Sequence, residues 1–391
     1  MTSSTKNQEP GTRNQKQKAC RFLFLNQFVP PDPAPTARLL GDVALELEAR
    51  GHEVILVGDR AGYRGEKTLL GSRALREGLS LLRLLVKTMT SPRADAIVCL
   101  TSPPMLPVVA WMARRRHGRA KLIHWAMDLY PDVAVALGEV REGSTLHRVT
   151  RSLMERVYRA CDLVVVLDRE MAARVGPDPL RCEIVPPWPP EVGSVHSQTE
   201  VPSADFTWLY SGNLGRAHEW RTLLEAQFLL ERDGAEVNLV FQGGGAERQA
   251  AQGLADELGL KRCFWRDYAP EDTLVSSLLA ADALVVTQRP GTAGCLWPSK
   301  LALALTVDRP VLWIGATNGG VAEVVSEAGH SSFAPGEATA LAQRLRELAE
   351  ARAEEVPSLD PALLTARIAD ARRRGISAVA DLFEEAVARI S

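Results

Sequence analysis

The sequence predicts an α/β protein made of two domains with parallel sheets, and three observations support this. The chain has 391 residues, which is too many for one hydrophobic core. In both halves, short apolar runs alternate with amphipathic helical patterns, as in a parallel sheet with crossover helices. A proline-rich stretch around Pro186-Pro-Trp-Pro-Pro190 separates the halves, because such a sequence continues neither a helix nor a central strand.

The first half opens with a strand–helix–strand unit. The apolar run Phe22–Leu25 ends shortly before Pro30 and predicts a buried strand. Residues 36–50 have apolar positions at helical spacing, and Gly51 supplies the left-handed residue that ends a helix. Further apolar runs complete the predicted sheet over residues 53–57, 96–100, 121–125 and 163–167.

The predicted domain boundaries follow from these patterns. Residues 1–19 are polar and lack the apolar stretch of a secretory signal, so they are expected to form a disordered tail. The N-terminal domain is predicted over 20–185 and a linker over 186–204. The C-terminal domain, over 205–355, has expected strands at 206–210, 237–242, 283–287 and 310–314. Closing helices are expected over 337–352 and 361–390.

The composition excludes several classes of protein. A hydrophobic fraction of 46% with 24% charged residues is ordinary for a globular chain. A net charge of −2 argues against a dedicated nucleic-acid binder. The six cysteines stand singly, without a C-x-x-C pair, and indicate neither a disulfide framework nor a zinc site. Without an apolar run of about 18 residues, the expectation is a cytoplasmic enzyme.

Glycine-rich turns follow two predicted strands of the C-terminal domain. In Tyr210-Ser-Gly-Asn-Leu-Gly-Arg216, backbone N–H groups near Gly212, Asn213 and Gly215 can approach an anion, with Arg216 beside them. An ordinary strand-to-helix turn is the alternative. The second turn contains Gln242, Gly243 and Gly244, and Arg248 stands where a dinucleotide fingerprint needs its last glycine. A nicotinamide oxidoreductase is therefore poorly supported.

Lys300 is the strongest single candidate for a functional side chain. It follows a loop with Gly294, Pro298 and Ser299 and begins an apolar helical stretch. A lysine there can neutralise the charge of an anionic group that develops during a reaction. The alternative is a solvated lysine, which the helix dipole slightly disfavours in a first turn.

A second candidate, Asp128, follows a predicted strand of the N-terminal domain. Asp128 can orient or deprotonate an acceptor hydroxyl, or it can be a turn residue ahead of Pro131. His124, within the apolar strand, is expected in the core, and Asp132 is expected to cap a helix.

Several segments together resemble the family 4 glycosyltransferases, in particular their WbuB-like branch. These segments are Leu25–Asp32 with Thr36–Arg38, Gly51–Val54, Trp125–Asp132, Tyr210–Arg216, Gln242–Gly245, and Trp297–Lys300 followed by Arg309-Pro310. The resemblance implies the GT-B fold, in which two Rossmann-like domains with parallel sheets face a central cleft. It also implies that the C-terminal helices, within 356–391, pack back on the N-terminal domain.

The resemblance implies a function as well. It is a retaining transfer of a hexosyl unit from a nucleotide-diphospho-sugar to a glycan or polyprenyl-linked acceptor, in cell-surface polysaccharide synthesis. No obligatory metal or other cofactor is implied, and no Asp-x-Asp motif is found. The catalytic residues are then Asp128 and Lys300. The donor-binding residues are Gly212, Asn213, Gly215, Arg216, Gln242, Gly243, Gly244, Gly294, Pro298 and Ser299.

The chain departs from the family at four positions. The Glu-x7-Glu motif that contacts the donor in many members is replaced by Cys295 and Leu303. The Arg and Lys that often accompany the first glycine turn are replaced by Asn213 and His218, for which Arg216 can compensate. Two alternatives therefore stay open: a non-catalytic relative that binds a nucleotide sugar or serves as a scaffold, and a GT-B nucleotide-sugar epimerase.

Residues 69–93 interleave leucines with basic residues, including Arg73, Arg76, Arg83 and Lys87. A basic amphipathic helix can lie on the anionic inner face of a membrane. A packed surface helix with solvated arginines is the alternative.

Overall fold

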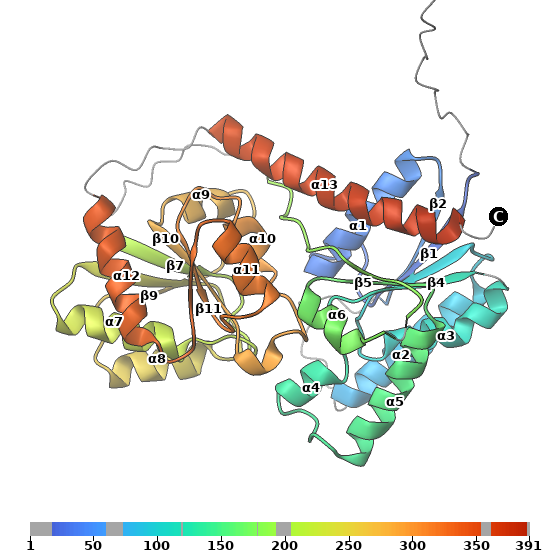
Figure 1. Cartoon of the computed structure of the whole chain (residues 1–391), viewed down its shortest axis with the longest axis horizontal. Helices are drawn as coiled ribbons and strands as arrows, with labels where there is room; N and C mark the ends of the chain where they lie inside the picture. The colour runs from blue at the N-terminus through green and yellow to red at the C-terminus, as the bar shows by residue number, and fades with distance from the viewer. Residues whose placement is uncertain are drawn as a thin grey trace, which may run out of the picture.

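The computed structural model describes residues 18–59, 73–118, 120–177, 179–192, 205–352 and 361–388. Most of the predicted tail and residues 193–204 of the predicted linker lie outside these ranges. The described residues form two α/β domains side by side, with one long C-terminal helix across the top of the first domain (Figure 1). Two parallel six-stranded sheets are present, and the prediction of two parallel α/β domains is confirmed.

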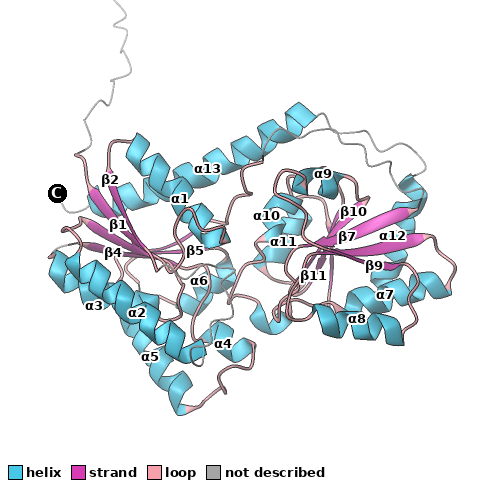
Figure 2. Cartoon of the chain, turned by 180° about the vertical axis from the view of Figure 1, so that it is seen from behind, coloured by secondary structure: helices cyan, strands magenta, loops and turns pink. Residues whose placement is uncertain are grey.

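The N-terminal sheet has the strand order β2-β1-β3-β4-β5-β6. Its strands are β1 (Arg21–Leu25), β2 (Glu53–Val57), β3 (Ala96–Cys99), β4 (Lys121–Trp125), β5 (Leu163–Val166) and β6 (Cys182–Ile184). Its helices are α1 (Pro35–Ala49), α2 (Arg73–Thr90), α3 (Leu106–Ala113), α4 (Asp132–Ala136), α5 (Thr145–Ala160) and α6 (Arg169–Val175). Helices α2, α3 and α5 lie together on one side of the sheet, away from α1 (Figures 1 and 2).

The C-terminal sheet has the strand order β12-β11-β10-β7-β8-β9. Its strands are β7 (Phe206–Ser211), β8 (Val237–Gln242), β9 (Cys263–Arg266), β10 (Ala283–Thr287), β11 (Val311–Ile314) and β12 (Ser331–Phe333). Its helices are α7 (Arg221–Arg232), α8 (Arg248–Glu257), α9 (Leu274–Leu279), α10 (Lys300–Ala304), α11 (Gly320–Glu327) and α12 (Ala338–Ala351). The central strands β8 and β10 are buried throughout, as expected for parallel strands covered on both faces.

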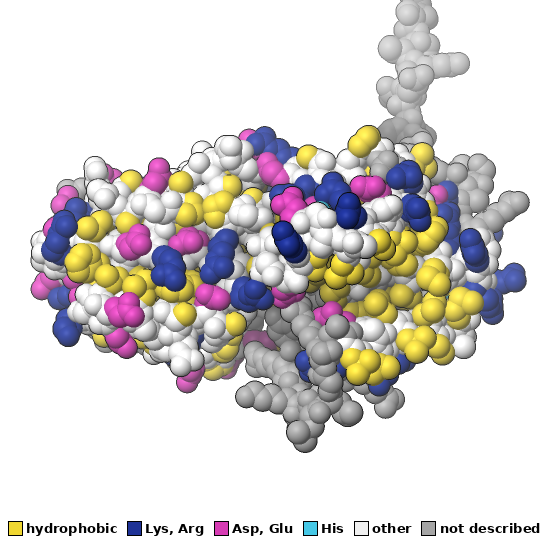
Figure 3. Space-filling view, turned by 90° about the horizontal axis from the view of Figure 1, so that it is seen from below, with side chains coloured by type: hydrophobic (Ala, Val, Ile, Leu, Met, Phe, Trp, Pro, Cys, Tyr) yellow, Lys and Arg dark blue, Asp and Glu magenta, His cyan; other side chains and the backbone are white. Residues whose placement is uncertain are grey.

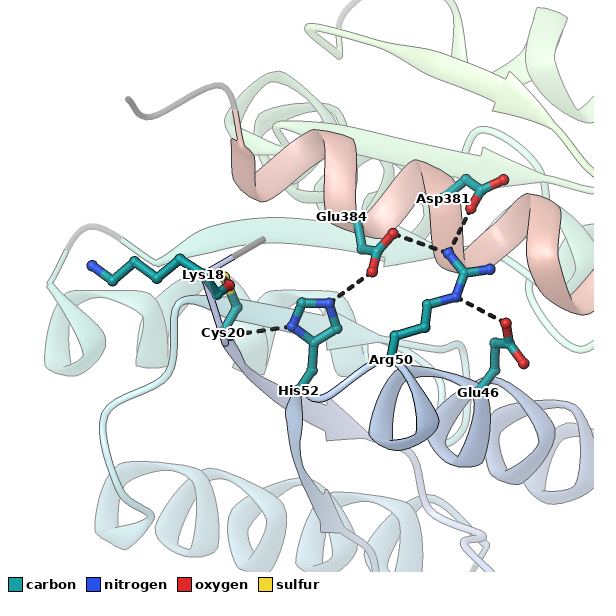
Figure 4. A network of polar contacts seen from close by, with 7 residues as sticks. All are labelled: Lys18, Cys20, Glu46, Arg50, His52, Asp381 and Glu384. Carbon is teal, nitrogen blue, oxygen red and sulfur yellow. Dashed lines mark hydrogen bonds and ion pairs between the residues drawn. The ribbon is translucent and has the colours of Figure 1, made fainter. Parts of the chain in front are cut away.

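The last helix, α13 (Pro361–Ala388), returns to the N-terminal domain and packs on α1 and β4. Phe383 is fully buried there, against Phe24 and Trp125. A polar clasp, formed by Arg50 and His52 with Asp381 and Glu384, holds the end of the helix (Figure 4). The helix therefore belongs to the N-terminal domain in space, although it is last in the chain.

The clasp depends on Glu384. Its carboxylate accepts hydrogen bonds from Arg50 at 2.9 Å and from Nε2 of His52 at 2.7 Å. The backbone N–H of Cys20 donates to Nδ1 of His52, so the neutral ring has its proton on Nε2, facing the carboxylate. Glu384 is 11% exposed and Asp381 59% exposed, so the two acids are expected to differ in their contribution to stability.

We predict that Glu384→Ala destabilises the protein by about 2 kcal/mol, because it leaves the buried His52 without its acceptor and removes one of the three carboxylates that Arg50 contacts. The melting midpoint should fall by about 5 °C. The matched control is Asp381→Ala, which should cost less than about 1 kcal/mol because that pair is solvated. Thermal denaturation followed by circular dichroism measures both. Equal losses in the two variants would contradict the assignment of the clasp to Glu384.

Candidate active site

A cavity of about 660 Å³ lies between the two domains. The N-terminal domain contributes Pro33, Pro35, Arg38 and Asp42, and Arg372 of α13 joins them. The C-terminal domain contributes residues from the ends of β7 and β8 and from the start of α10, among them Gly212, Gln242, Ser299, Lys300 and Leu303. Ligands of open α/β sheets bind at the carboxyl ends of the strands, which is where this cavity lies.

Lys300, on the cavity wall, has three hydrogen-bond partners and all are uncharged. Its Nζ donates to the hydroxyl of Tyr210 at 2.8 Å and to the backbone carbonyl of Asn213 at 3.0 Å. It also lies 3.1 Å from Nε2 of His218. No carboxylate of the described residues forms an ion pair with this ammonium. Burial lowers the pKa of Lys300 from 10.5 to about 7. An anion bound in the cavity would stabilise the protonated form of this side chain.

His218 holds a defined orientation against the lysine. Its Nδ1 lies 2.8 Å from the carbonyl oxygen of Thr287, which can only accept, so Nδ1 carries the proton. Nε2 is therefore an acceptor for the ammonium of Lys300. Burial, followed by the charge of Lys300, lowers the pKa of His218 to about 3. His218 thus stays neutral and orients Lys300 through a hydrogen bond. Many family members are expected to have a lysine or arginine in place of His218.

The glycine turns after β7 and β8 are packed against one another. Gly212 N–H donates to the carbonyl of Gln242, and Leu214 N–H donates to that of Gly244. At Gly212, with φ +122°, a Cβ would stand 2.5 Å from Cε of Lys300. At Gly243, with φ +132°, a Cβ would stand 2.3 Å from the Gly212 carbonyl oxygen. These two glycines therefore permit the close approach of the turns and of the lysine.

The cavity wall beyond the lysine is largely apolar. Its members are Leu209, Leu274, Leu278, Leu284, Val286 and Leu303, with the ring of Tyr268 nearby. Glu271 adds a carboxylate to the lining. A polar end beside Lys300 and an apolar wall suit a ligand that has an anionic part and a flat, less polar part.

Sequence reasoning did not identify Tyr268 and Glu271, because they follow β9, which was not predicted. Four of the predicted residues do line the cavity: Gly212, Gln242, Ser299 and Lys300. Asn213 is adjacent through its carbonyl, and Gly215, Gly243 and Gly244 belong to the packed turns. Pro298 lies just before α10, where its carbonyl accepts from the backbone of Leu301.

Arg216 and Gly294 lie at the domain interface rather than in the cavity lining. Arg216 forms an ion pair with Glu139 at 3.2 Å and donates to the carbonyl of Leu137. Gly294 has a φ of +67°, and a Cβ there would stand 2.8 Å from Cβ of Glu170. The structure therefore places the Arg216 guanidinium on the N-terminal domain, and its compensating role toward a donor stays a prediction.

Asp128 also lies at the interface, in an antiparallel bridge with Leu296. The neighbouring Leu129 donates from its backbone to the carbonyl of Cys295 at 2.8 Å. Burial raises the pKa of Asp128 from 3.8 to about 6, which suits a general base near neutral pH. Asp128 is not part of the lining of the cavity that contains Lys300, so the structure does not bring the two predicted catalytic residues together there; Asp128 contacts the loop before α10 at Leu296.

The structure also shows where the other residues discussed from the sequence lie. His124 is 1% exposed, and its Nδ1 is 3.0 Å from the carbonyl of Cys99. Burial lowers the pKa of His124 to about 4. Asp132 begins α4 and pairs with Arg151 and Arg174. Of the two positions without family carboxylates, Cys295 is buried at the interface and Leu303 lines the cavity.

Comparison with known protein families identifies both halves of the chain. Residues 36–188 match the model described as the glycosyl transferase 4-like domain. Residues 194–358 match the model described as glycosyl transferases group 1. The chain is a family 4-like glycosyltransferase. The transferase is 25% identical to the probable glycosyltransferase WbjE of Pseudomonas aeruginosa, over 73% of this chain and 74% of that one.

A second relative and two solved structures are also similar to this chain. The putative colanic acid biosynthesis glycosyl transferase WcaI of Escherichia coli strain K12 is 30% identical over 30% of the transferase and 28% of its own length. Anabaena HepE, solved with UDP and glucose, superposes with a TM-score of 0.62 at 16% identity, covering 95% of the transferase and 100% of HepE. Sucrose-phosphate synthase from Thermosynechococcus elongatus gives 0.64 at 16% identity, covering 95% and 97%. The predicted GT-B fold is confirmed.

The described residues of the transferase contain neither a membrane-spanning helix nor a cluster of metal ligands. No helix in them combines the length and the apolar character needed to cross a bilayer. No group of three or more His, Cys, Asp or Glu residues in them is arranged to hold a metal ion.

We predict that Lys300→Met raises thermal stability and that the gain depends on pH. The folded-state pKa lies below the unfolded value, so wild type has the full penalty of a buried charge below pH 7 and loses that penalty as pH rises toward 10.5. The variant should melt at least about 2 °C higher than wild type at about pH 6, and the difference should shrink by about pH 9. A difference that does not change with pH would contradict a depressed lysine pKa.

Proposed function

We propose that the transferase moves a hexosyl unit, with retention of configuration, from a nucleotide-diphospho-sugar to a glycan or polyprenyl-linked acceptor. The observation that supports this is the ammonium of Lys300, which faces a cavity between the domains and has only uncharged partners. An anionic group such as a diphosphate would complete its surroundings. The apolar wall beside it has room for a nucleoside.

In the proposed reaction, the bond between the sugar C1 and the diphosphate oxygen breaks, and its electron pair stays on the diphosphate. Lys300 stabilises the charge that develops there, without an obligatory metal or cofactor. The acceptor hydroxyl forms the new bond to C1 on the same face, and Asp128 takes its proton. Closure of the domains over the donor excludes water and suppresses hydrolysis.

Gly212, Gln242 and Ser299 are proposed to contact the donor with Lys300, since all four line one cavity. Among the cavity's carboxylates, Glu271 belongs to the C-terminal domain, as Lys300 does, and we propose that it contacts the ribose hydroxyls in place of the family carboxylate that Leu303 replaces. This proposal favours a transferase over a non-catalytic relative, which would not need an uncompensated lysine at the cleft.

The proteins to which this chain is similar support a role in the synthesis of surface polysaccharides. WcaI is named for colanic acid biosynthesis, and WaaG, whose structure superposes with a TM-score of 0.58 at 17% identity, is named for lipopolysaccharide biosynthesis. HepE was solved with UDP-glucose. We accordingly propose a role in cell-surface polysaccharide synthesis at the cytoplasmic face of the membrane, and membership of the WbuB-like branch stays part of this proposal.

We predict that one nucleotide family stabilises the protein in a thermal-shift screen of UDP, GDP, dTDP and CMP with their common sugar conjugates. At about 100 times its Kd, a ligand adds about 2.7 kcal/mol to the free energy of unfolding. The folded Lys300→Met variant is the matched control and should lose most of this response, because the ammonium would contact the diphosphate. No response in wild type to any of these compounds would contradict donor binding and favour a scaffold.

We also predict a bell-shaped pH dependence of kcat/KM once a donor is known. The limbs should lie near pH 6 and pH 7, because the pKa of Asp128 is about 6 and that of Lys300 about 7. Activity needs the carboxylate ionised and the lysine protonated, so it should fall about tenfold per pH unit outside the two limbs.

Asp128→Asn separates the two contributions. It should lower kcat/KM by about a hundredfold and flatten the acidic limb, while the alkaline limb remains. An unchanged acidic limb in Asp128→Asn would contradict the role of Asp128 as the base.

A further inference from the structure

One surface of the N-terminal domain is not explained by transfer chemistry. Helix α2 exposes five large apolar side chains, each at least 41% accessible: Leu75, Leu79, Leu82, Val86 and Met89. They recur every three or four residues, so they form one straight line along the helix. We call this line the α2 stripe.

The α2 stripe points away from the protein. The opposite side of the helix packs on the core through the fully buried Leu84, with Ser80 and Thr88 buried beside it. Thr88 donates its hydroxyl to the carbonyl of Leu84 and is thereby satisfied within the helix. Because the inner side of α2 already packs on the core, the stripe is a second apolar face that no described residue of this chain covers.

Neighbouring helices extend the apolar surface. Helix α3 packs beside α2 and exposes Met112, and α5 packs beside α3 and exposes Leu146 and Val149. From below, hydrophobic side chains gather over this side of the N-terminal domain, with Lys and Arg side chains at its margins (Figure 3). Contiguous apolar surface of this kind on a folded domain indicates an interaction site.

Basic charge is concentrated in α2, in α5 and in the 3-10 turn Arg114–His117 that follows α3, which itself has no charged residue. Residues 73–118, which include α2 and α3, have eight Lys or Arg against two Asp or Glu. Helix α5 has four Arg against one Glu. The whole chain has a net charge of −2, so the excess of positive charge on this face is local, and the partner it fits is anionic.

We propose that this face, formed by α2, α3 and α5, docks the enzyme on an anionic lipid bilayer. The stripe enters the boundary between headgroups and acyl chains, while the flanking basic residues contact the anionic headgroups, each contributing about 1 kcal/mol. A second copy of the chain is a poorer occupant, because two such faces would bring like charges together. The proposal rests on the α2 stripe and its charge and goes beyond the transfer reaction.

Co-sedimentation of the full chain with vesicles tests this. Wild type should bind vesicles containing about 25 mol% phosphatidylglycerol in phosphatidylcholine at least about tenfold more than pure phosphatidylcholine vesicles, and raised salt should weaken the binding. The double variant Leu79→Glu with Leu82→Glu should lose at least about tenfold in partitioning, because two carboxylates would enter the apolar layer. Leu45→Glu is the matched control, since Leu45 is more exposed than either Leu79 or Leu82 but lies on α1, across the sheet; its partitioning should stay within about twofold of wild type.

Three results would overturn the proposal. The first is equal partitioning of wild type and the double variant, and the second is equal binding to anionic and neutral vesicles. The third is a dimer of wild type, seen by light scattering, that the double variant dissociates while neither protein binds lipid. Circular dichroism and the nucleotide thermal shift, which the double variant should retain, show that folding and the donor site are intact. A loss of the nucleotide response would instead concern the transferase proposal.

Discussion

The ammonium of Lys300, surrounded by acceptors but without a counter-ion, is the interaction on which the site depends. A phenol hydroxyl, a backbone carbonyl and a neutral imidazole can each accept one hydrogen bond from it, yet none of them cancels its charge. The free protein therefore holds a cation that would gain free energy from any anion placed in the cavity. The protein loses stability by burying this charge, which is the usual relation between a preorganised site and the stability of its scaffold.

The sheet topology makes this arrangement possible. The turns after β7 and β8 lie side by side because their strands are neighbours in one parallel sheet. Gly212 and Gly243 let those turns touch and leave space for the stem of Lys300. His218 follows the first turn, and its proton is fixed by a carbonyl at the end of β10, a third neighbouring strand. Three strands thus set the position and the protonation of two side chains.

Sequence patterns predicted the buried strands, which have apolar runs. They did not predict the short edge strands β6, β9 and β12 or the contacts between residues far apart in the chain. The buried strands β1, β4, β8 and β10 have nearly continuous apolar runs, which predict strands directly. Strands β6, β9 and β12 are short, lie at sheet edges and are mostly half-buried or exposed, so no comparable apolar run indicates them. Missing β9 meant missing Tyr268 and Glu271 at its end.

The candidate site likewise contains residues that a local sequence pattern indicates and contacts that no local pattern indicates. Lys300 and the glycine turns have local signals, a loop before a helix and glycines after strands. The contact between Lys300 and His218 spans 82 positions of the chain, and no local pattern indicates it. Arg216 shows a contact that its local sequence does not indicate: it lies beside a glycine turn, as an anion ligand would, and in this structure it pairs with Glu139 of the other domain. Which acid an arginine meets is decided by the docking of the two domains.

That docking also decides whether Asp128 and Lys300 can act together. Asp128 pairs with Leu296 across the interface, and Leu296 stands four residues before Lys300 in the same loop and helix start. Glu170 accepts from the backbone N–H of Gly320 at the start of α11, and Arg174 donates to the carbonyl of Ala293. The bridge is made by the backbone, and the other two contacts join a side chain of α6 to the backbone of the C-terminal domain, so a rotation that opened the cleft would break all of them together. Together they hold the loop before α10 against the N-terminal domain, with the Asp128 contact at Leu296 and Lys300 at the start of the helix that follows.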